Sequence, residues 1–262
     1  MLLNGARYKG VMSVTFPGES PEYRAARDLL LADEIDLRRR IEAVASARRA
    51  LPQGGVVPED YVFDGADASG TKARVTLSAL FSPGKSTLVV YHMMFPRDPS
   101  DRRAGAATGE TARLPLDAAP CPSCTALLDQ LDGAVEHVAP HLDFVVVAKA
   151  PIERVLTFAK ERGWRNLRFV SSAKNHFNRD YHGETTSGEQ RPMLNVFARA
   201  GETIRHFWGS EMLYTAADPK QDPRHVGLLE PSWNIFDLTR DGRKEDWDEQ
   251  LQYDADCHCE KT

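Results

Sequence analysis

The four residues Cys121-Pro122-Ser123-Cys124 place two thiols at a spacing that lets them react with each other. The proline in second position suits the first turn of a helix, so we expect Cys121 at a helix N-terminus. There the unpaired backbone N–H groups and the positive end of the helix dipole favour the thiolate over the thiol. Because the thiolate is the nucleophile, Cys121 is the candidate attacking residue and Cys124 the candidate resolving residue.

The surroundings of this pair support a redox interpretation. A nearly all-apolar run, 86–95, predicts a buried strand ahead of the pair, and a helix is predicted from Pro122 through Val135. In a cytosolic protein, a CxxC within such a β-α-β pattern is typical of a thioredoxin-like redox motif. We interpret Pro122 and Ser123 as residues that tune oxidation of the pair and contact the substrate. This mechanism needs no cofactor and no metal.

Three other interpretations of the cysteines stay open, and one of them is that they are inert structural residues, since free cysteine is commonly buried. Cys257-His258-Cys259 near the C-terminus could join Cys121 and Cys124 in a four-sulfur zinc site, which would make the protein an interaction module. A thiol peroxidase of peroxiredoxin type would use Cys121 with hydrogen-bond donors around a peroxide, for which Arg191 is the candidate. The strand-then-helix context favours redox chemistry over zinc.

Composition excludes several classes of protein. The 262 residues are 42% hydrophobic and 27% charged, as in an ordinary globular protein. The net charge of −5, without a dense basic block, argues against a nucleic-acid partner. No apolar run approaches the roughly 18 residues of a membrane span, and the N-terminus has no long apolar segment typical of export signals. We therefore expect a cytoplasmic protein with a protein or small-molecule disulfide or thiol as substrate.

Hydrophobic patterning predicts an α/β fold with a mixed sheet. A helix is expected from about Pro21 to Ala50, and a charged C-terminal stretch, 238–262, is expected to fray. Between them lie, in order, a hairpin (61–63 and 73–76), the strand 86–95, a long loop (96–120), the CxxC helix, a strand (144–148), a helix (151–161), a strand (167–170) and a second hairpin (193–197 and 203–207). This order predicts an N-terminal helical arm (1–52), an α/β sandwich (53–240) and a charged tail (241–262).

The N-terminal helix is expected to be about 45 Å long, more than the width of a compact domain. One of its faces is apolar, so it must lie across the domain or reach a second subunit. A homodimer through this helix is therefore possible.

Several short segments occur together in order along residues 22–240. They are Arg48-Arg49-Ala50-Leu51-Pro52, Leu77-Ser78-Ala79-Leu80-Phe81, Tyr91-His92-Met93-Met94-Phe95, Cys121-Pro122-Ser123-Cys124, Ala150-Pro151, Arg162-Gly163-Trp164, Val170-Ser171-Ser172 and Phe177-Asn178-Arg179-Asp180. With this set the chain resembles a bacterial family of thioredoxin-like proteins of unknown function, which are predicted to be dithiol–disulfide oxidoreductases. The resemblance implies a thioredoxin fold with a peroxiredoxin-like N-terminal hairpin, and redox-active Cys121 and Cys124.

One departure from the family concerns the loop before the CxxC. The family usually has a short link there, whereas this chain has residues 96–120, which could act as a lid or a docking element. The order of proline, strand, glycine turn and strand at Pro192 also resembles thioredoxins. It implies a cis Arg191–Pro192 bond beside the thiols, with Arg191 and Pro192 contacting the substrate.

Overall fold

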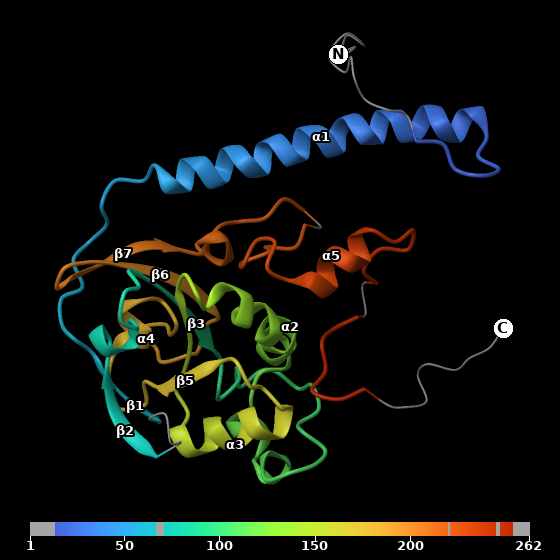
Figure 1. Cartoon of the computed structure of the whole chain (residues 1–262). Coiled ribbons are helices and arrows are strands. Elements are labelled where there is room, and N and C mark those ends of the chain that lie inside the picture. The colour runs from blue at the N-terminus through green and yellow to red at the C-terminus, as the bar shows by residue number, and fades with distance from the viewer. Residues whose placement is uncertain (1–13, 67–70, 220, 245–246, 254–262) are drawn as a thin grey trace. The chain divides into compact units, whose positions relative to one another are not determined.

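The computed structural model describes residues 14–66, 71–219, 221–244 and 247–253. The chain divides after Pro52 into two compact units. The first contains the long helix α1 (Pro21–Arg49), and the second contains the β-sheet (Figure 1).

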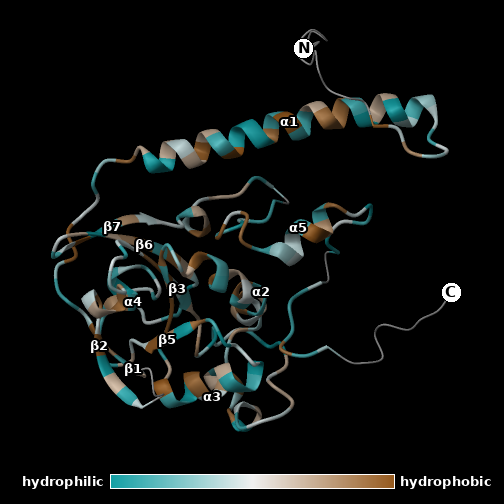
Figure 2. Cartoon of the chain, in the orientation of Figure 1, coloured by the Kyte–Doolittle hydropathy of each residue, from teal (hydrophilic) through white to brown (hydrophobic). Residues whose placement is uncertain are grey.

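Helix α1 begins and ends where its sequence predicts. The Ser20 hydroxyl accepts a hydrogen bond from the Tyr23 N–H at 3.2 Å, which caps the first turn, and Pro21 occupies that turn. None of its residues is buried, and hydrophilic and hydrophobic residues alternate along it (Figure 2). Leu30 and Leu37 on the apolar face remain exposed. A homodimer through this face stays a prediction.

The strands of the described residues form one seven-stranded sheet in the order β2-β1-β5-β4-β3-β6-β7. They are β1 (Val62–Ala66), β2 (Lys72–Thr76), β3 (Thr87–Met93), β4 (Asp143–Ala148), β5 (Arg168–Ser171), β6 (Met193–Ala200) and β7 (Thr203–Gly209). Strands β3, β4 and β5 run parallel, and an antiparallel hairpin flanks them on each side. The mixed sheet is therefore the one that the sequence predicts.

The helices cover the two faces of this sheet. Residues of α2 (Pro122–Val138) and α3 (Ile152–Arg162) pack with Tyr91 of β3 in one hydrophobic cluster. On the opposite face, Val90 packs with residues of the short helix α4 (Phe177–Asp180) in a second cluster. The alternation of neighbouring residues along β3 separates the clusters. The fold is the expected α/β sandwich with a mixed sheet, preceded by a long helix. No helix in the described ranges has the length and apolar character needed to cross a bilayer.

Two short helices and part of the C-terminal stretch differ from expectation. The sequence did not predict α4 or α5 (Pro231–Asp237), since one or two helical turns are too short to show a period. The sequence predicts that the whole C-terminal stretch frays, but residues 247–251 do not, because Glu249 and Leu251 are buried. Leu251 joins the cluster of α2 and α3, and Arg162 Nη1 donates to its carbonyl at 2.7 Å.

The long loop 96–120 is anchored by a buried arginine. Arg97 is 1% exposed, and its guanidinium donates to the Pro120 carbonyl at 3.1 Å and to the Arg103 carbonyl at 2.7 Å. It also lies 3.8 Å from the Asp101 carboxylate. Backbone hydrogen bonds pair the two ends of the loop, from Arg97 N to the Ala119 carbonyl at 2.9 Å. The loop therefore leaves and returns at one place beside β3.

Replacing Arg97 with alanine should destabilise the fold by about 2–4 kcal/mol, because buried carbonyls and a carboxylate would lose their partner. Urea unfolding measures this change. Arg102→Ala is the matched control, since Arg102 is an exposed arginine of the same loop. Equal stabilities of the two variants would show that Arg97 does not hold the loop.

Candidate active site

Cys121 stands at the N-cap of α2, directly beyond the end of β3. Its N–H donates to the Met94 carbonyl at 3.0 Å, and its own carbonyl accepts from Thr125 N at 3.0 Å. Cys124 lies one turn into the helix, where its sulfur accepts a hydrogen bond from the Tyr91 hydroxyl at 3.3 Å. Both cysteines are unbridged thiols, only 1% and 2% exposed. The structure thus brings together two reduced thiols at a helix N-terminus.

The surroundings shift the acidities of the two thiols in opposite directions. A hydrogen bond from the Cys124 thiol lowers the pKa of Cys121, and the Cys124 N–H and the Arg103 guanidinium lower it further, against the effect of burial. The pKa of Cys124 rises well above its ordinary value, because its proton bonds Cys121 and because the site is buried. Cys121 is therefore the more acidic thiol of the pair, and Cys124 the less acidic one.

Arg103 of the long loop covers the thiols. Its Nη2 lies 3.9 Å from Cys121 Sγ, and its Nη1 donates to the Ser123 hydroxyl at 2.8 Å. Asp101 holds the guanidinium at 2.8 Å and Asp248 holds it at 2.6 Å. The loop and the C-terminal segment 247–251 therefore meet over the CxxC.

Two buried glutamates extend this cluster. Glu249 accepts hydrogen bonds from the Ser123 hydroxyl at 2.9 Å and from Trp233 Nε1 at 2.7 Å. Burial opposes ionisation of Glu249, but these hydrogen bonds hold its pKa below the ordinary value. Burial, together with the charge of Glu249, raises the pKa of Glu230 to about 7. One carboxylate is thus stabilised as an anion, while the other retains its proton up to near-neutral pH.

The family of the chain follows from a match over nearly its whole length. Residues 13–257 match the family model described as bacterial protein of unknown function (DUF899). The chain belongs to this family. The resemblance in the sequence is confirmed, and a search of curated proteins finds no match.

Solved structures similar to this DUF899 protein include several peroxiredoxins. Xanthomonas campestris peroxiredoxin Q is 15% identical, with 59% of this chain and 86% of that chain covered and a TM-score of 0.37. Peroxidoxin BcpB from Mycobacterium tuberculosis is 15% identical, with 71% and 97% covered and a TM-score of 0.36. The mitochondrial 2-Cys peroxiredoxin from Plasmodium falciparum is 11% identical, with 69% and 94% covered and a TM-score of 0.38.

The expectation of a cis Arg191–Pro192 bond is wrong. Within the described residues the cis peptide bond is Phe95–Pro96, so the bond before Pro192 is trans. The Arg191 N–H donates to the Gly183 carbonyl at 3.0 Å, in a backbone path that needs no cis turn. The ordinary preference for trans prevails there. The argument for a thioredoxin-type substrate groove at this proline loses its support.

The contacts of Arg191 differ from those expected of a residue that donates hydrogen bonds to a peroxide beside Cys121. Its guanidinium pairs with Glu189 at 3.2 Å and approaches Asp98 at 3.9 Å. The arginine beside the Cys121 sulfur is Arg103, which the sequence did not reveal, because it lies in a loop without periodicity. Tyr91 belongs to one of the segments that carry the family resemblance, and its hydroxyl donates a hydrogen bond to Cys124 Sγ. Substrate contacts by Pro122, Ser123, Arg191 and Pro192 stay predictions.

A zinc site formed by all four cysteines is not tested. Among the described residues, no group of three or more His, Cys, Asp or Glu side chains is arranged to hold a metal ion. Cys257 and Cys259 lie outside those residues. The zinc hypothesis therefore needs a measurement of metal content.

Alkylation rates against pH should show a midpoint for Cys121 below that of an ordinary cysteine, about 8.5. Cys124→Ala should move this midpoint upward most, because the Cys124 thiol makes the largest contribution to the lowered pKa, and Arg103→Gln should move it upward less. Arg113→Gln, in the same loop, is the control and should leave the midpoint in place. A midpoint at the ordinary value in the unaltered protein would contradict the assignment of Cys121 as thiolate.

Replacing Glu230 should change how stability depends on pH. The raised pKa means that the stabilisation by the protonated carboxyl is complete below pH 4.5 and is lost as the pH rises through about 7. Between about pH 5 and pH 8 the free energy of unfolding should therefore fall by on the order of 2 kcal/mol more in the unaltered protein than in Glu230→Gln. Urea titrations measure the difference, with exposed Glu202→Gln as control. Parallel curves for the unaltered protein and Glu230→Gln would refute a proton held by this carboxyl.

Proposed function

We propose that this DUF899 protein is a dithiol–disulfide oxidoreductase. The observation that carries the proposal is the adjacent pair of reduced thiols with oppositely shifted pKa values at the N-terminus of α2. An enzyme of this kind needs one thiol ready to attack and a second that keeps its proton until the first has reacted. Cys121 and Cys124 meet these two requirements.

The reaction proceeds in two exchanges. The Cys121 thiolate attacks one sulfur of a disulfide, the substrate S–S bond breaks, and a thiolate leaves while a mixed disulfide forms on Cys121. Cys124 then loses its proton to the departing thiolate or to solvent and attacks Cys121 Sγ. This step releases the second substrate thiol and leaves a Cys121–Cys124 disulfide. The substrate is reduced by two electrons and the protein is oxidised by two.

Burial of the thiols restricts the substrate. Loop 96–120 and segment 247–251 meet over the CxxC through Arg103, Ser123 and Asp248. A disulfide in a folded protein would reach Cys121 only after these contacts open. The closed arrangement therefore favours a low-molecular-weight substrate.

A thiol peroxidase is the second candidate, and Arg103 favours it. A guanidinium 3.9 Å from the Cys121 sulfur provides donors for a bound peroxide, which is small enough for a covered site. The Cys121 thiolate would attack one peroxide oxygen, the O–O bond would break, and an alkoxide or hydroxide would leave and take a proton from solvent to become an alcohol or water. Condensation of the resulting sulfenic acid with the Cys124 thiol would give the same disulfide and one water.

Cys121→Ser should abolish reduction of a small aromatic disulfide and of hydrogen peroxide, because the attacking sulfur is missing. Cys124→Ser should form one covalent adduct per chain with the disulfide and then stall, as mass spectrometry of the intact protein would show. The disulfide and the peroxide are compared at equal concentration, and the faster reaction identifies the enzyme class.

The double variant Cys257→Ser/Cys259→Ser is the control and should retain activity. Activity that survives in Cys121→Ser would exclude the proposed nucleophile. One zinc per chain in the unaltered protein, lost in the double variant, would establish the interaction module instead.

A further inference from the structure

A cavity of about 640 Å³ lies on the face of the sheet away from the thiols. Met193 and Asn195 of β6 line it, and in the sheet Asn195 pairs with Val90, which packs on the α4 side. Leu194, between them, pairs with Tyr91 on the side of the thiols. The cavity is thus separate from the candidate active site, and its volume is typical of a small-molecule site.

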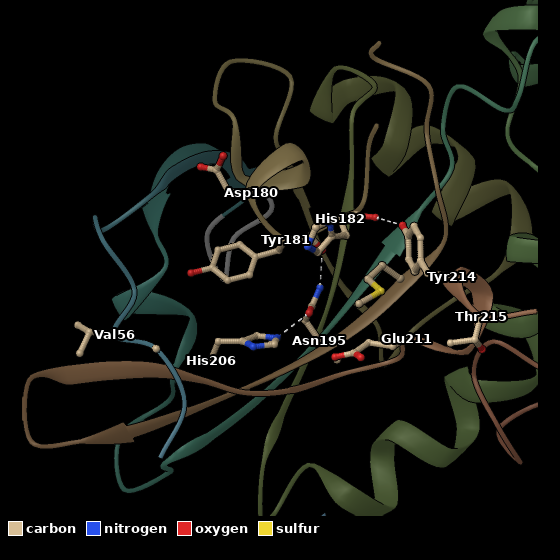
Figure 3. A pocket seen from close by; sticks show the side chains of 12 residues that line it. Val56, Asp180, Tyr181, His182, Asn195, His206, Glu211, Tyr214 and Thr215 are labelled. Carbon is tan, nitrogen blue, oxygen red and sulfur yellow. Dashed lines mark hydrogen bonds between the residues drawn. The ribbon is translucent and has the colours of Figure 1, made fainter. Parts of the chain in front are cut away.

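The floor of the cavity is a hydrogen-bond network around the buried amide of Asn195 (Figure 3). Its Nδ2 donates to the Tyr181 carbonyl and to His92 Nε2, both at 3.0 Å, while His206 Nε2 donates to its Oδ1 at 2.8 Å. This network assigns the Nε2–H tautomer to His206 and leaves Nδ1 as an acceptor. Burial lowers the pKa of His206, so its ring is neutral at pH 7.

Aromatic rings form the walls. Tyr181 and His206 pack with ring centroids 5.6 Å apart, and His182 and Tyr214 with centroids 5.9 Å apart. In Figure 3, Tyr181 and His206 lie to the left of Asn195 and Tyr214 to the right. The Tyr214 hydroxyl donates to the His182 carbonyl at 2.7 Å, and His182 has a φ of 58°. Left-handed backbone at a non-glycine residue is uncommon and concentrates at functional sites.

The charged side chains of the lining are acidic. Asp180 is already engaged, because it accepts from the Tyr61 hydroxyl at 2.8 Å and lies 3.6 Å from Arg179. The exposed carboxylate of Glu211 makes no ion pair or hydrogen bond with the other described side chains, and the described lining contains no lysine or arginine. Such a site disfavours anions, and the negative charge of Glu211, which acts on the His206 ring, has no ion-pair partner among the described residues.

We propose that this cavity binds a compact organic cation, such as a quaternary or substituted ammonium compound. Tyr181 and Tyr214 both line the cavity, and aromatic rings attract a positive charge through their quadrupoles, while Glu211 of the same lining would neutralise it. Neutral His206 adds no positive charge that would repel the ligand. This binding does not depend on the proposed redox reaction, since none of these residues contacts Cys121 or Cys124.

Isothermal titration calorimetry with choline and benzyltrimethylammonium tests the proposal on the full chain. The control ligand is the neutral carbon isostere of choline, in which a tert-butyl group replaces the trimethylammonium group. We expect binding of at least one cation and affinity for the isostere at least about tenfold weaker, the range of a desolvated cation–π contact. The double variant Cys121→Ser/Cys124→Ser should bind the cation as the unaltered protein does, so failure of the redox proposal would leave this result in place.

Two pairs of variants assign the binding to this cavity. Tyr214→Leu should weaken the cation by about tenfold, whereas Tyr214→Phe, which keeps the ring, should retain most of the affinity. Glu211→Gln should weaken binding severalfold. Because Glu211 is exposed, this substitution should leave the stability of the fold unchanged. Tyr23→Leu on α1 is the control and should have no effect.

Three results would overturn the proposal. The first is equal affinity for choline and its neutral isostere, and the second is the absence of binding by both cations. The third is unchanged affinity in Glu211→Gln and in a folded Tyr214→Leu.

Discussion

The hydrogen bond from the Cys121 N–H to the Met94 carbonyl determines where the thiols lie. It holds the first residue of the CxxC beside the end of β3, although a long loop separates the two in the chain. The neighbouring bond from Arg97 N to the Ala119 carbonyl closes the base of that loop. A long insertion whose ends are paired costs little more conformational entropy than a short one, because loop-closure entropy grows slowly with length. The protein therefore keeps a helix N-terminus at the end of the central strand and gains a covering segment.

The covering segment carries buried charges, which are expensive. Arg97 and Arg103 from the loop, and Glu249 from the C-terminal segment, are removed from water to a large degree. Apolar side chains of similar volume would commonly be as stable or more so. The charges are arranged around Cys121, where Arg103 favours the thiolate while Glu230 retains its proton. Perturbed acidities of this kind concentrate at functional sites, which supports a chemical rather than a structural role for the cluster.

The sequence predicts the parts of this structure that depend on local patterns. Periodicity and capping residues identify α1, and continuous apolar runs identify the buried central strands. The CxxC identifies the thiols, because its chemistry requires only a fixed spacing within one helical turn. The residues that cover the thiols come from segments far apart in the chain, and nothing in residues 96–120 marks Arg103 as the arginine that reaches the sulfur. At Pro192 the sequence predicts too much. The order of proline, strand, glycine turn and strand implies a cis bond there, but the bond is trans.

Strand β3 connects the two proposed sites and also keeps them apart. Its consecutive residues Tyr91 and His92 point to opposite faces, so that the Tyr91 hydroxyl bonds Cys124 while His92 bonds the Asn195 amide under the cavity. Strands β4 and β6 pair with β3 on both sides along its length. A ligand in the cavity could influence the thiols by displacing this doubly paired strand, because Tyr91 and His92 are consecutive residues of β3. The hydrogen bonds of the buried Asn195 amide resist such displacement, since each lost bond would leave a buried polar group unpaired. The two sites therefore share a scaffold, but each has its own chemistry.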